Sequence, residues 1–185
     1  TTYNFTNHLI ALEDKFAGKK IDLNKSELTL HKIRTSNTII ANGHIERFIS
    51  FRNNDLPGVM LASSFEKYIH RYGVVPEKEP VIFTNNSSSL SLLKKLISLG
   101  CKPKAYVDSR KKDNIETEIK KILKDKEIPF FSDAEIEGCD GNKKVETITI
   151  RQGKSFNKLK SSMLCVSGGY NPDIHLFTQS KGLVK

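Results

Sequence analysis

The sequence predicts an α/β protein in which a Rossmann-like parallel-sheet lobe carries a β-meander. Three observations support this fold class. An apolar run at 80–83 is followed by a helical pattern at 90–97. A second apolar run, 104–107, ends in Asp108, about 20 residues past the turn, as in a dinucleotide-binding unit. Strand-like segments then follow, two of them joined by an Asp-Gly turn at 140–141.

The N-terminal flank contains few regular elements. Residues 1–18 form a weakly amphipathic segment that ends at a glycine. Two short β-like runs, 28–33 and 38–41, are separated by polar residues and predict a hairpin or a pair of adjacent strands. Residues 44–58 are expected to be a loop, because Asn, Asp, Pro and Gly gather there.

A helix is predicted over 60–72. The residues that recur at helical spacing are Met60, Leu61, Phe65, Tyr68, Ile69 and Tyr72. Gly73 stops this helix, and a proline follows shortly after.

The turn at 84–89, between the first strand and its helix, contains no glycine. Glycines at such a turn let the backbone approach a pyrophosphate closely. We therefore predict that the scaffold of a nucleotide site is kept while its phosphate cradle is lost. Thr84, Asn85 and Ser87 are interpreted as helix caps, and Asp108 as a surface acid at a strand end rather than a ribose ligand.

The C-terminal half is expected to be mostly β-structure. A charged helix is predicted over 113–126, with Asp113 as its N-cap. Phe130 begins the third strand, and the meander with its Asp-Gly turn follows. The apolar run 163–166 is predicted to be a buried strand, and the tail 170–185 a loop.

Composition limits the function classes. The chain has 185 residues, a mean hydropathy of −0.41 and no apolar run near the roughly 20 residues of a membrane span, so no membrane partner is expected. The net charge of +9 comes from scattered lysines without interleaved aromatics, so no nucleic acid partner is expected. Cys101, Cys139 and Cys165 are interpreted as free thiols of a reducing, cytoplasmic compartment. Neither a metal site nor a catalytic residue is predicted, because no His or Cys spacing fits one.

Several segments together resemble the alpha subunit of heterotetrameric sarcosine oxidase. That family also has Phe-Thr-Asn-Asn in place of a glycine turn. The segments that carry the resemblance are residues 40–47, 53–62, 71–74, 83–86, 166–172 and 175–180. No single segment is specific, but their combination covers nearly the whole chain.

The resemblance implies a disulfide-oxidoreductase-like FAD/NAD(P)-binding fold with two lobes. An inserted, degenerate NAD(P)-binding-like lobe is expected at 78–160. Residues 1–77 and 161–185 are expected to be parts of an FAD-like lobe that holds NAD. The candidate cofactor-binding residues are those of two glycine turns: Ala41, Asn42, Gly43, Ser167, Gly168 and Gly169. From the residues alone, the first turn could also be a simple turn, and the second could make room for a ligand or for a crossing chain.

The resemblance also implies an assembly with beta, gamma and delta subunits, FAD and FMN in the complex, and NAD in the alpha subunit. Such a complex oxidatively demethylates sarcosine to glycine, with oxygen as acceptor. We expect this chain to be an internal fragment that is inactive alone and binds no cofactor tightly. Two alternatives remain open: a stand-alone scaffold or binding module, and a subunit of a related amine or opine dehydrogenase.

Overall fold

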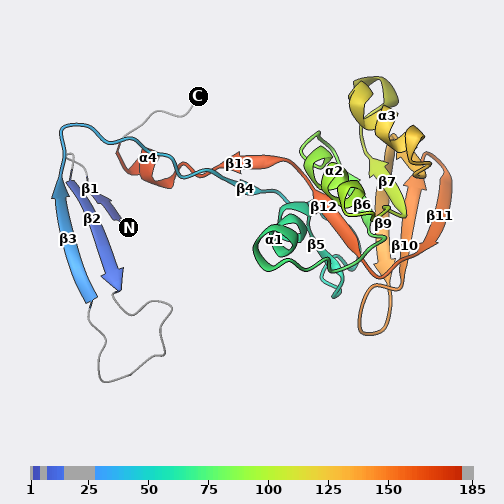
Figure 1. Cartoon of the computed structure of the whole chain (residues 1–185), viewed down its shortest axis with the longest axis horizontal. Coiled ribbons are helices and arrows are strands. Elements are labelled where there is room, and N and C mark those ends of the chain that lie inside the picture. Colours follow the sequence, from blue (N-terminus) through green and yellow to red (C-terminus); the bar gives the residue numbers. More distant parts are fainter. Residues whose placement is uncertain (1, 5–7, 15–27, 181–185) are drawn as a thin grey trace. The chain divides into compact units, whose positions relative to one another are not determined.

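The computed structural model describes residues 2–4, 8–14 and 28–180, which form two compact units (Figure 1). The larger unit runs from Glu46 to Asn171. The smaller unit comprises the described residues up to Ile45 and from Pro172 onwards.

A five-stranded parallel sheet is the centre of the larger unit. Its order is β5 (Val59–Leu61), β12 (Leu164–Ser167), β6 (Val81–Thr84), β7 (Ala105–Asp108) and β8 (Phe130–Ser132). The three central strands, β12, β6 and β7, are buried along their whole length. Their apolar runs therefore do not alternate with polar residues, as expected of a sheet covered on both faces.

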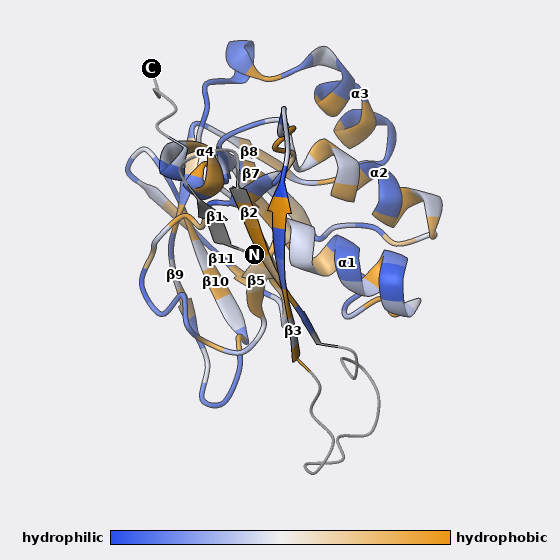
Figure 2. Ribbon diagram, turned by 90° about the vertical axis from the view of Figure 1, so that its left-hand side faces the viewer, coloured by the Kyte–Doolittle hydropathy of each residue, from blue (hydrophilic) through white to orange (hydrophobic). Residues whose placement is uncertain are grey.

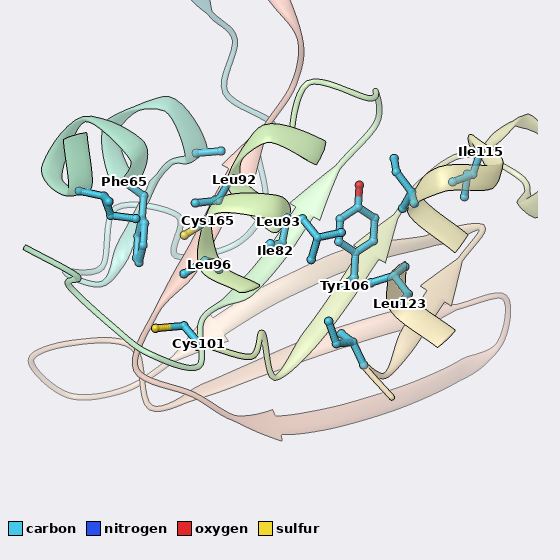
Figure 3. Packing of buried hydrophobic residues seen from close by; sticks show 14 residues of the cluster. Phe65, Ile82, Leu92, Leu93, Leu96, Cys101, Tyr106, Ile115, Leu123 and Cys165 are labelled. Atoms are coloured by element: carbon cyan, nitrogen blue, oxygen red, sulfur yellow. The ribbon is translucent and has the colours of Figure 1, made fainter. Parts of the chain in front are cut away.

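Three helices cover one face of this sheet: α1 (Ala62–Tyr72), α2 (Leu90–Ser98) and α3 (Thr117–Asp125). Each helix turns a short apolar stripe towards the strands, for example Leu92, Leu93 and Leu96 of α2. These leucines pack with Ile82 of β6 and Tyr106 of β7 in one buried cluster (Figure 3). A 3₁₀ turn, η1 (Lys112–Asn114), precedes α3.

An antiparallel meander covers the other face. It consists of β9 (Ala134–Asp140), β10 (Thr147–Gln152) and β11 (Ser155–Lys160), in the order β11-β10-β9. Ile136, Ile148 and Ile150 of the meander pack against Val81 and Phe83 of β6 in a second buried cluster. The predicted meander and its Asp-Gly hairpin are therefore confirmed.

The smaller unit contains an antiparallel sheet of β1 (Thr2–Asn4), β2 (His8–Asp14) and β3 (Leu28–Arg34), and the short helix α4 (His175–Gln179). Leu12 lies opposite Leu30, and both side chains are more than half exposed. Polar and apolar residues are interspersed along β3, whose apolar residues are Leu28, Leu30 and Ile33 (Figure 2). The unit boundary passes through β4 (His44–Glu46) and β13 (Tyr170–Pro172), which pair with each other.

Several predicted elements differ from the structure. Residues 38–41 form no strand, because β3 pairs with β2 along seven residues. The helix predicted from 60 begins at Ala62, since Val59–Leu61 is the edge strand β5. Asp113 is not the N-cap of α3, because residues 112–114 form η1 and α3 starts at Thr117. The tail, predicted as a loop, contains β13 and α4 up to Gln179. The predicted end of the weakly amphipathic segment, Gly18, lies outside the described residues.

The larger unit is wider than the lobe predicted at 78–160. The reason is that β5 and β12, from both flanks, hydrogen-bond into the same sheet as β6–β8, and α1 packs on that sheet. The assignment of the remaining flanks to an NAD-holding lobe stays a prediction.

Candidate functional site

The candidate site is the carboxyl edge of the parallel sheet. Open α/β sheets bind ligands at this edge, where the strand connections reverse direction. Here β6 continues through α2 to β7 on one side, while its neighbour on the other side, β12, enters from the meander. Three segments meet at this edge: residues 84–89 after β6, 108–110 after β7 and 167–169 after β12.

The turn after β6 is filled by its own polar side chains. The Asn86 side-chain amide donates to the Ser167 carbonyl oxygen (3.0 Å), and its side-chain oxygen accepts from the Ser88 N–H (2.8 Å). The Thr84 hydroxyl accepts from the Asn86 N–H (3.1 Å) and lies 3.1 Å from the same Ser167 carbonyl oxygen. Two backbone amides of the turn, those of Asn86 and Ser88, are therefore bound within the protein and not free for a phosphate.

The predicted helix caps are only partly found. Thr84 binds a backbone amide of the turn, but the N-cap of α2 is Ser89, which makes no side-chain cap hydrogen bond. The Ser89 hydroxyl instead pairs with the buried Tyr106 hydroxyl (2.8 Å). The Ser87 hydroxyl donates to the Glu116 carboxylate and accepts from Arg110 Nη1. It therefore links the turn to neighbouring segments of the larger unit.

Asp108 is fully buried, so its interpretation as a surface acid is wrong. Both of its carboxylate oxygens are bound by Arg110: Oδ1 by the backbone N–H (2.9 Å) and Nε (3.1 Å), and Oδ2 by Nη2 (2.8 Å). The guanidinium folds back over the strand end and neutralises the acid. The carboxylate that would accept a ribose hydroxyl is thus already occupied.

Arg110 also links the two loops of the edge. Its Nη1 donates to the Ser87 hydroxyl (3.2 Å), and its Nη2 lies 3.3 Å from the Glu116 carboxylate. The hydrogen bonds that the Arg110 guanidinium donates, first to Asp108 and then to Glu116, raise its pKa. The hydrogen bond from the Ser87 hydroxyl lowers the pKa of Glu116. Together these bonds join the segment after β6 to the segment after β7. The Arg110 cluster is the name used below for Asp108, Arg110, Glu116 and Ser87.

The second glycine turn, Ser167–Gly169, accommodates a crossing chain. A Cβ on Gly168 would lie 2.7 Å from the Arg47 carbonyl oxygen and 3.0 Å from Ile49 Cγ1. Backbone hydrogen bonds join Gly168 N–H to the Arg47 carbonyl (2.9 Å) and Arg47 N–H to the Gly169 carbonyl (2.7 Å). Within the described residues, the buried Ser167 hydroxyl has no hydrogen-bond partner. Close packing of residues 47–49 therefore accounts for the glycine at 168.

The first glycine turn lies in the smaller unit, whereas Ser167–Gly169 lie in the larger one. Ala41, Asn42 and Gly43 are exposed. Gly43 has a φ of +75°, and a Cβ there would have open space around it. Close approach of a ligand to the backbone is sterically possible at this turn. That Ala41, Asn42 and Gly43 bind a cofactor stays a prediction.

Two cavities open beside the edge on the meander side, and no sequence pattern predicts them. One, of about 190 Å³, is lined by Ile49, Ser50, Phe83, Asn85, Ser109, Glu135 and Ile136. The other, of about 210 Å³, is lined by Ser109, Asp133, Glu135, Arg151 and Gly153. Arg151 pairs with both Glu135 and Glu137, so its own charge is compensated and one negative charge is left over.

No catalytic constellation is found in the described part of the chain. No three His, Cys, Asp or Glu side chains within it could hold a metal ion. The three cysteines are buried free thiols, as predicted. Burial raises the pKa of Cys139 to about 11 and that of Cys165 well above its ordinary value, so both stay protonated and unreactive near neutral pH.

Solved structures with the same fold include a thioredoxin reductase and an FAD-dependent oxidoreductase. The thioredoxin reductase of T. acidophilum matches with a TM-score of 0.63 and 14% identity, over 90% of this chain and 55% of that one. An FAD-dependent pyridine nucleotide-disulphide oxidoreductase from Desulfovibrio vulgaris matches with a TM-score of 0.59 and 14% identity, over 84% of this chain and 42% of that one. The chain therefore has the fold of the FAD/NAD(P)-dependent disulfide oxidoreductases, as predicted.

Sequence comparison finds relatives that share one name. The chain is 33% identical to the sarcosine oxidase subunit alpha of Rhizobium meliloti (strain 1021), over 147 residues. It is 29% identical, over 157 residues, to the subunit of the same name from Corynebacterium sp. (strain U-96). These matches cover 80% and 81% of this chain but only 14% and 16% of the relatives. No family model matches. The resemblance to sarcosine oxidase subunit alpha is confirmed, and the chain spans about a seventh of those relatives' length.

No helix in the described ranges is long and apolar enough to cross a bilayer.

Proposed function

We propose that this chain acts as a non-catalytic scaffold of nucleotide-binding fold within an alpha-type subunit of a sarcosine oxidase. The Arg110 cluster is the observation that carries the scaffold part of the proposal, because it occupies the acid and the turn that a dinucleotide would use. The 33% identity over 147 residues supports the assignment to the alpha-type subunit.

In this proposal the reaction belongs to the whole assembly. The assembly oxidises sarcosine to glycine, with oxygen as acceptor, on flavin held by a partner subunit. NAD belongs to the lobe that includes Ala41, Asn42 and Gly43, where the exposed glycine leaves open space. Those three residues would approach the cofactor through their backbone, which binds and orients it without moving a proton.

The exposed apolar face of the smaller unit favours an assembly over an isolated module. Leu12, Leu28 and Leu30 lie on one face of β2 and β3 and are 57–60% exposed. Contiguous apolar surface of this kind marks a contact with another polypeptide surface. A stand-alone scaffold module is the second candidate, and it would have to cover the same face by self-association.

Titration with dinucleotides tests the scaffold assignment. We expect isothermal calorimetry to show no NAD or FAD binding tighter than about 1 mM, because the phosphate-binding amides of the larger unit are occupied. The homologous-fold enzyme from Desulfovibrio vulgaris, titrated under the same conditions, is the positive control. Micromolar binding that depends on residues 84–110 would refute the scaffold assignment.

Co-expression tests the assembly. The chain is co-expressed with the other subunits of a sarcosine oxidase. Stable association with a flavin-containing subunit, together with sarcosine-dependent peroxide formation, is expected. Absence of any associated subunit would favour the stand-alone module.

A further inference from the structure

A cavity of about 350 Å³ lies beside α3, and its lining comes from η1, from α3 and from the segment that leads into β8. It shares no lining residue with the two cavities at the carboxyl edge or with the Arg110 cluster. Its volume falls in the range of small-ligand pockets, roughly 300–1,000 Å³. The proposed scaffold role does not use this cavity, so an occupant here is independent of the proposed function.

The floor of the cavity is apolar and is fixed by the way in which α3 ends. The Ile128 N–H binds the Leu123 carbonyl oxygen (2.8 Å), and the Glu127 N–H binds that of Lys124 (3.1 Å). These are the two hydrogen bonds of a Schellman motif, which pairs the side chains of Leu123 and Ile128. Both are buried, and the half-buried Phe130 packs against the same cluster. Three apolar side chains on a well-ordered helix end therefore form one wall of the cavity.

Four charged side chains surround this floor: Lys112, Lys120, Lys124 and Glu127. Lys120 is held in place, because its Nζ donates to the Lys112 carbonyl oxygen (3.2 Å). Within the part of the chain that the structure describes, none of the four takes part in an ion pair. Three ammonium groups and one carboxylate leave a surplus of two positive charges around an apolar floor.

The helix dipole accounts for only part of this charge. Lys124 lies in the last turn of α3, where a cation is favoured. Lys112 precedes the helix, where a cation gains nothing from the dipole. A neighbouring lysine, Lys94 of α2, is paired with Glu118 of α3 (2.6 Å). No acid other than Glu127 lines the cavity, so the ammonium groups there are left for a ligand.

We propose that this cavity, hereafter the α3 cavity, binds a small organic anion. Its apolar body, of about a dozen non-hydrogen atoms, lies over Leu123, Ile128 and Phe130, and its anionic group contacts Lys112 and Lys124. The stems of the two lysines border the apolar body while their ammonium groups reach the anion. Because an ammonium is a point charge without a preferred plane, the site accepts a carboxylate or a phosphate monoester.

Titration of the full chain with 2-naphthoate and with 2-naphthyl phosphate, followed by amide NMR, tests the proposal. We expect saturable shifts of the Leu123, Glu127 and Ile128 amides with a Kd at or below about 1 mM. The tighter of the two probes identifies the preferred anionic group. 2-Naphthamide, which has the same ring and no charge, should bind at least about fivefold more weakly. Absence of saturable shifts at these amides with both anions would overturn the proposal.

Charge variants separate a site from general attraction to a basic protein. Lys112→Gln/Lys124→Gln should weaken naphthoate binding at least about fivefold, and Glu127→Gln should strengthen it about twofold. Lys111→Gln/Lys121→Gln is the matched control, since both lysines are exposed on the same segment and neither lines the cavity. It should bind like wild type. All of these substitutions leave the apolar floor intact, and equal weakening in the two double variants would overturn the proposal.

The same probe shows whether another stretch of polypeptide fills the α3 cavity in the complete subunit. Saturation-transfer NMR with 2-naphthoate is applied to the complete alpha-type subunit in its co-expressed assembly. Binding that Lys112→Gln/Lys124→Gln weakens is expected there too. Loss of binding in the complete subunit would mean that polypeptide covers the cavity, and the proposal would be wrong. Failure of the subunits to associate would count against the proposed function alone, because titration of the full chain does not depend on assembly.

Discussion

At the scale of single residues, Arg110 is the group on which the candidate site depends. Its side chain is 20% exposed, and it supplies both the backbone and the guanidinium donors to the fully buried Asp108. We expect Arg110→Met to lower the free energy of unfolding by about 3–5 kcal/mol, because it leaves a buried carboxylate without its countercharge. Urea denaturation measures this change.

Arg151 provides the control for that prediction. Its partners Glu135 and Glu137 are about half exposed, so Arg151→Met should cost less than about 1 kcal/mol. Adding Asp108→Asn to Arg110→Met should recover part of the lost stability, because the buried charge is then removed. Equal losses of unfolding free energy in the two arginine variants would mean that the buried Asp108–Arg110 pair stabilises the fold no more than the exposed pairs of Arg151 do.

The buried thiols predict a loss of stability in alkali. Burial raises the pKa of Cys139 from about 9 to about 11, and that of Cys165 well above 9. Their contribution is fully present below pH 9 and is lost as the pH rises through the raised values, because only the unfolded thiols ionise. The expected slope is at most about 1.4 kcal/mol per pH unit for each thiol.

Urea unfolding of the wild type and of Cys139→Ala/Cys165→Ala at pH 8, 9 and 10 isolates this effect from other titrating groups. The stability difference between the two proteins should shrink as the pH rises. Parallel pH profiles would show that neither thiol keeps its proton in the folded protein.

At the scale of elements, local signals were sufficient for β6, α2 and β7. A buried apolar run, a helical stripe and a second run specify these elements without reference to distant residues. The edge strand β5 could not be separated from α1, because Val59–Leu61 runs into the helix without a Gly or Pro. The partner of β3 could not be found either, since its pairing with β2 spans residues distant in sequence.

From the sequence, the candidate site was expected at the strand ends, but its side-chain contacts were not predicted. The turn at 84–89 has no glycine, and side chains of Thr84 and Asn86 bind the N–H groups of Asn86 and Ser88. That the turn has lost its phosphate site stays a prediction. Sequence could not show that Arg110 folds back onto Asp108, because an arginine two residues past a strand end can as well point to solvent. It also could not decide between a ligand and a crossing chain at Gly168.

A substitution at Gly168 decides between those two readings. The clash at 2.7 Å is with a backbone oxygen of Arg47, which cannot rotate away. Gly168→Ala should therefore cost about 1–3 kcal/mol in the absence of any ligand, as overpacking does. Ser167→Ala in the same turn should be neutral or slightly stabilising, because the deleted hydroxyl is buried without a partner in the described structure. Thermal unfolding measures both, and an unchanged Gly168→Ala protein would restore the ligand interpretation.

At the scale of the whole molecule, the boundaries of the larger unit predict which excised piece folds. Residues 46–171 contain all five parallel strands, the three helices and the meander. This piece should unfold cooperatively and give a dispersed amide spectrum. Residues 78–160 lack β5, α1 and β12, which exposes β6 as an edge and opens both buried clusters. That piece should aggregate or remain unfolded. Cooperative unfolding of residues 78–160 would instead support the narrower lobe predicted from the sequence.

The smaller unit makes the complementary prediction. A three-stranded sheet needs a covered apolar face to be stable, and Leu12 and Leu30 leave that face largely exposed. Leu12→Thr/Leu30→Thr should therefore reduce self-association in sedimentation experiments without lowering the melting temperature. Leu92→Thr, at a fully buried position of α2, should lower the melting temperature and leave self-association of the folded protein unchanged. If the β2–β3 variant instead loses stability while the wild type is already monomeric, the leucines are covered within the chain. The case for an assembly would then rest on sequence similarity alone.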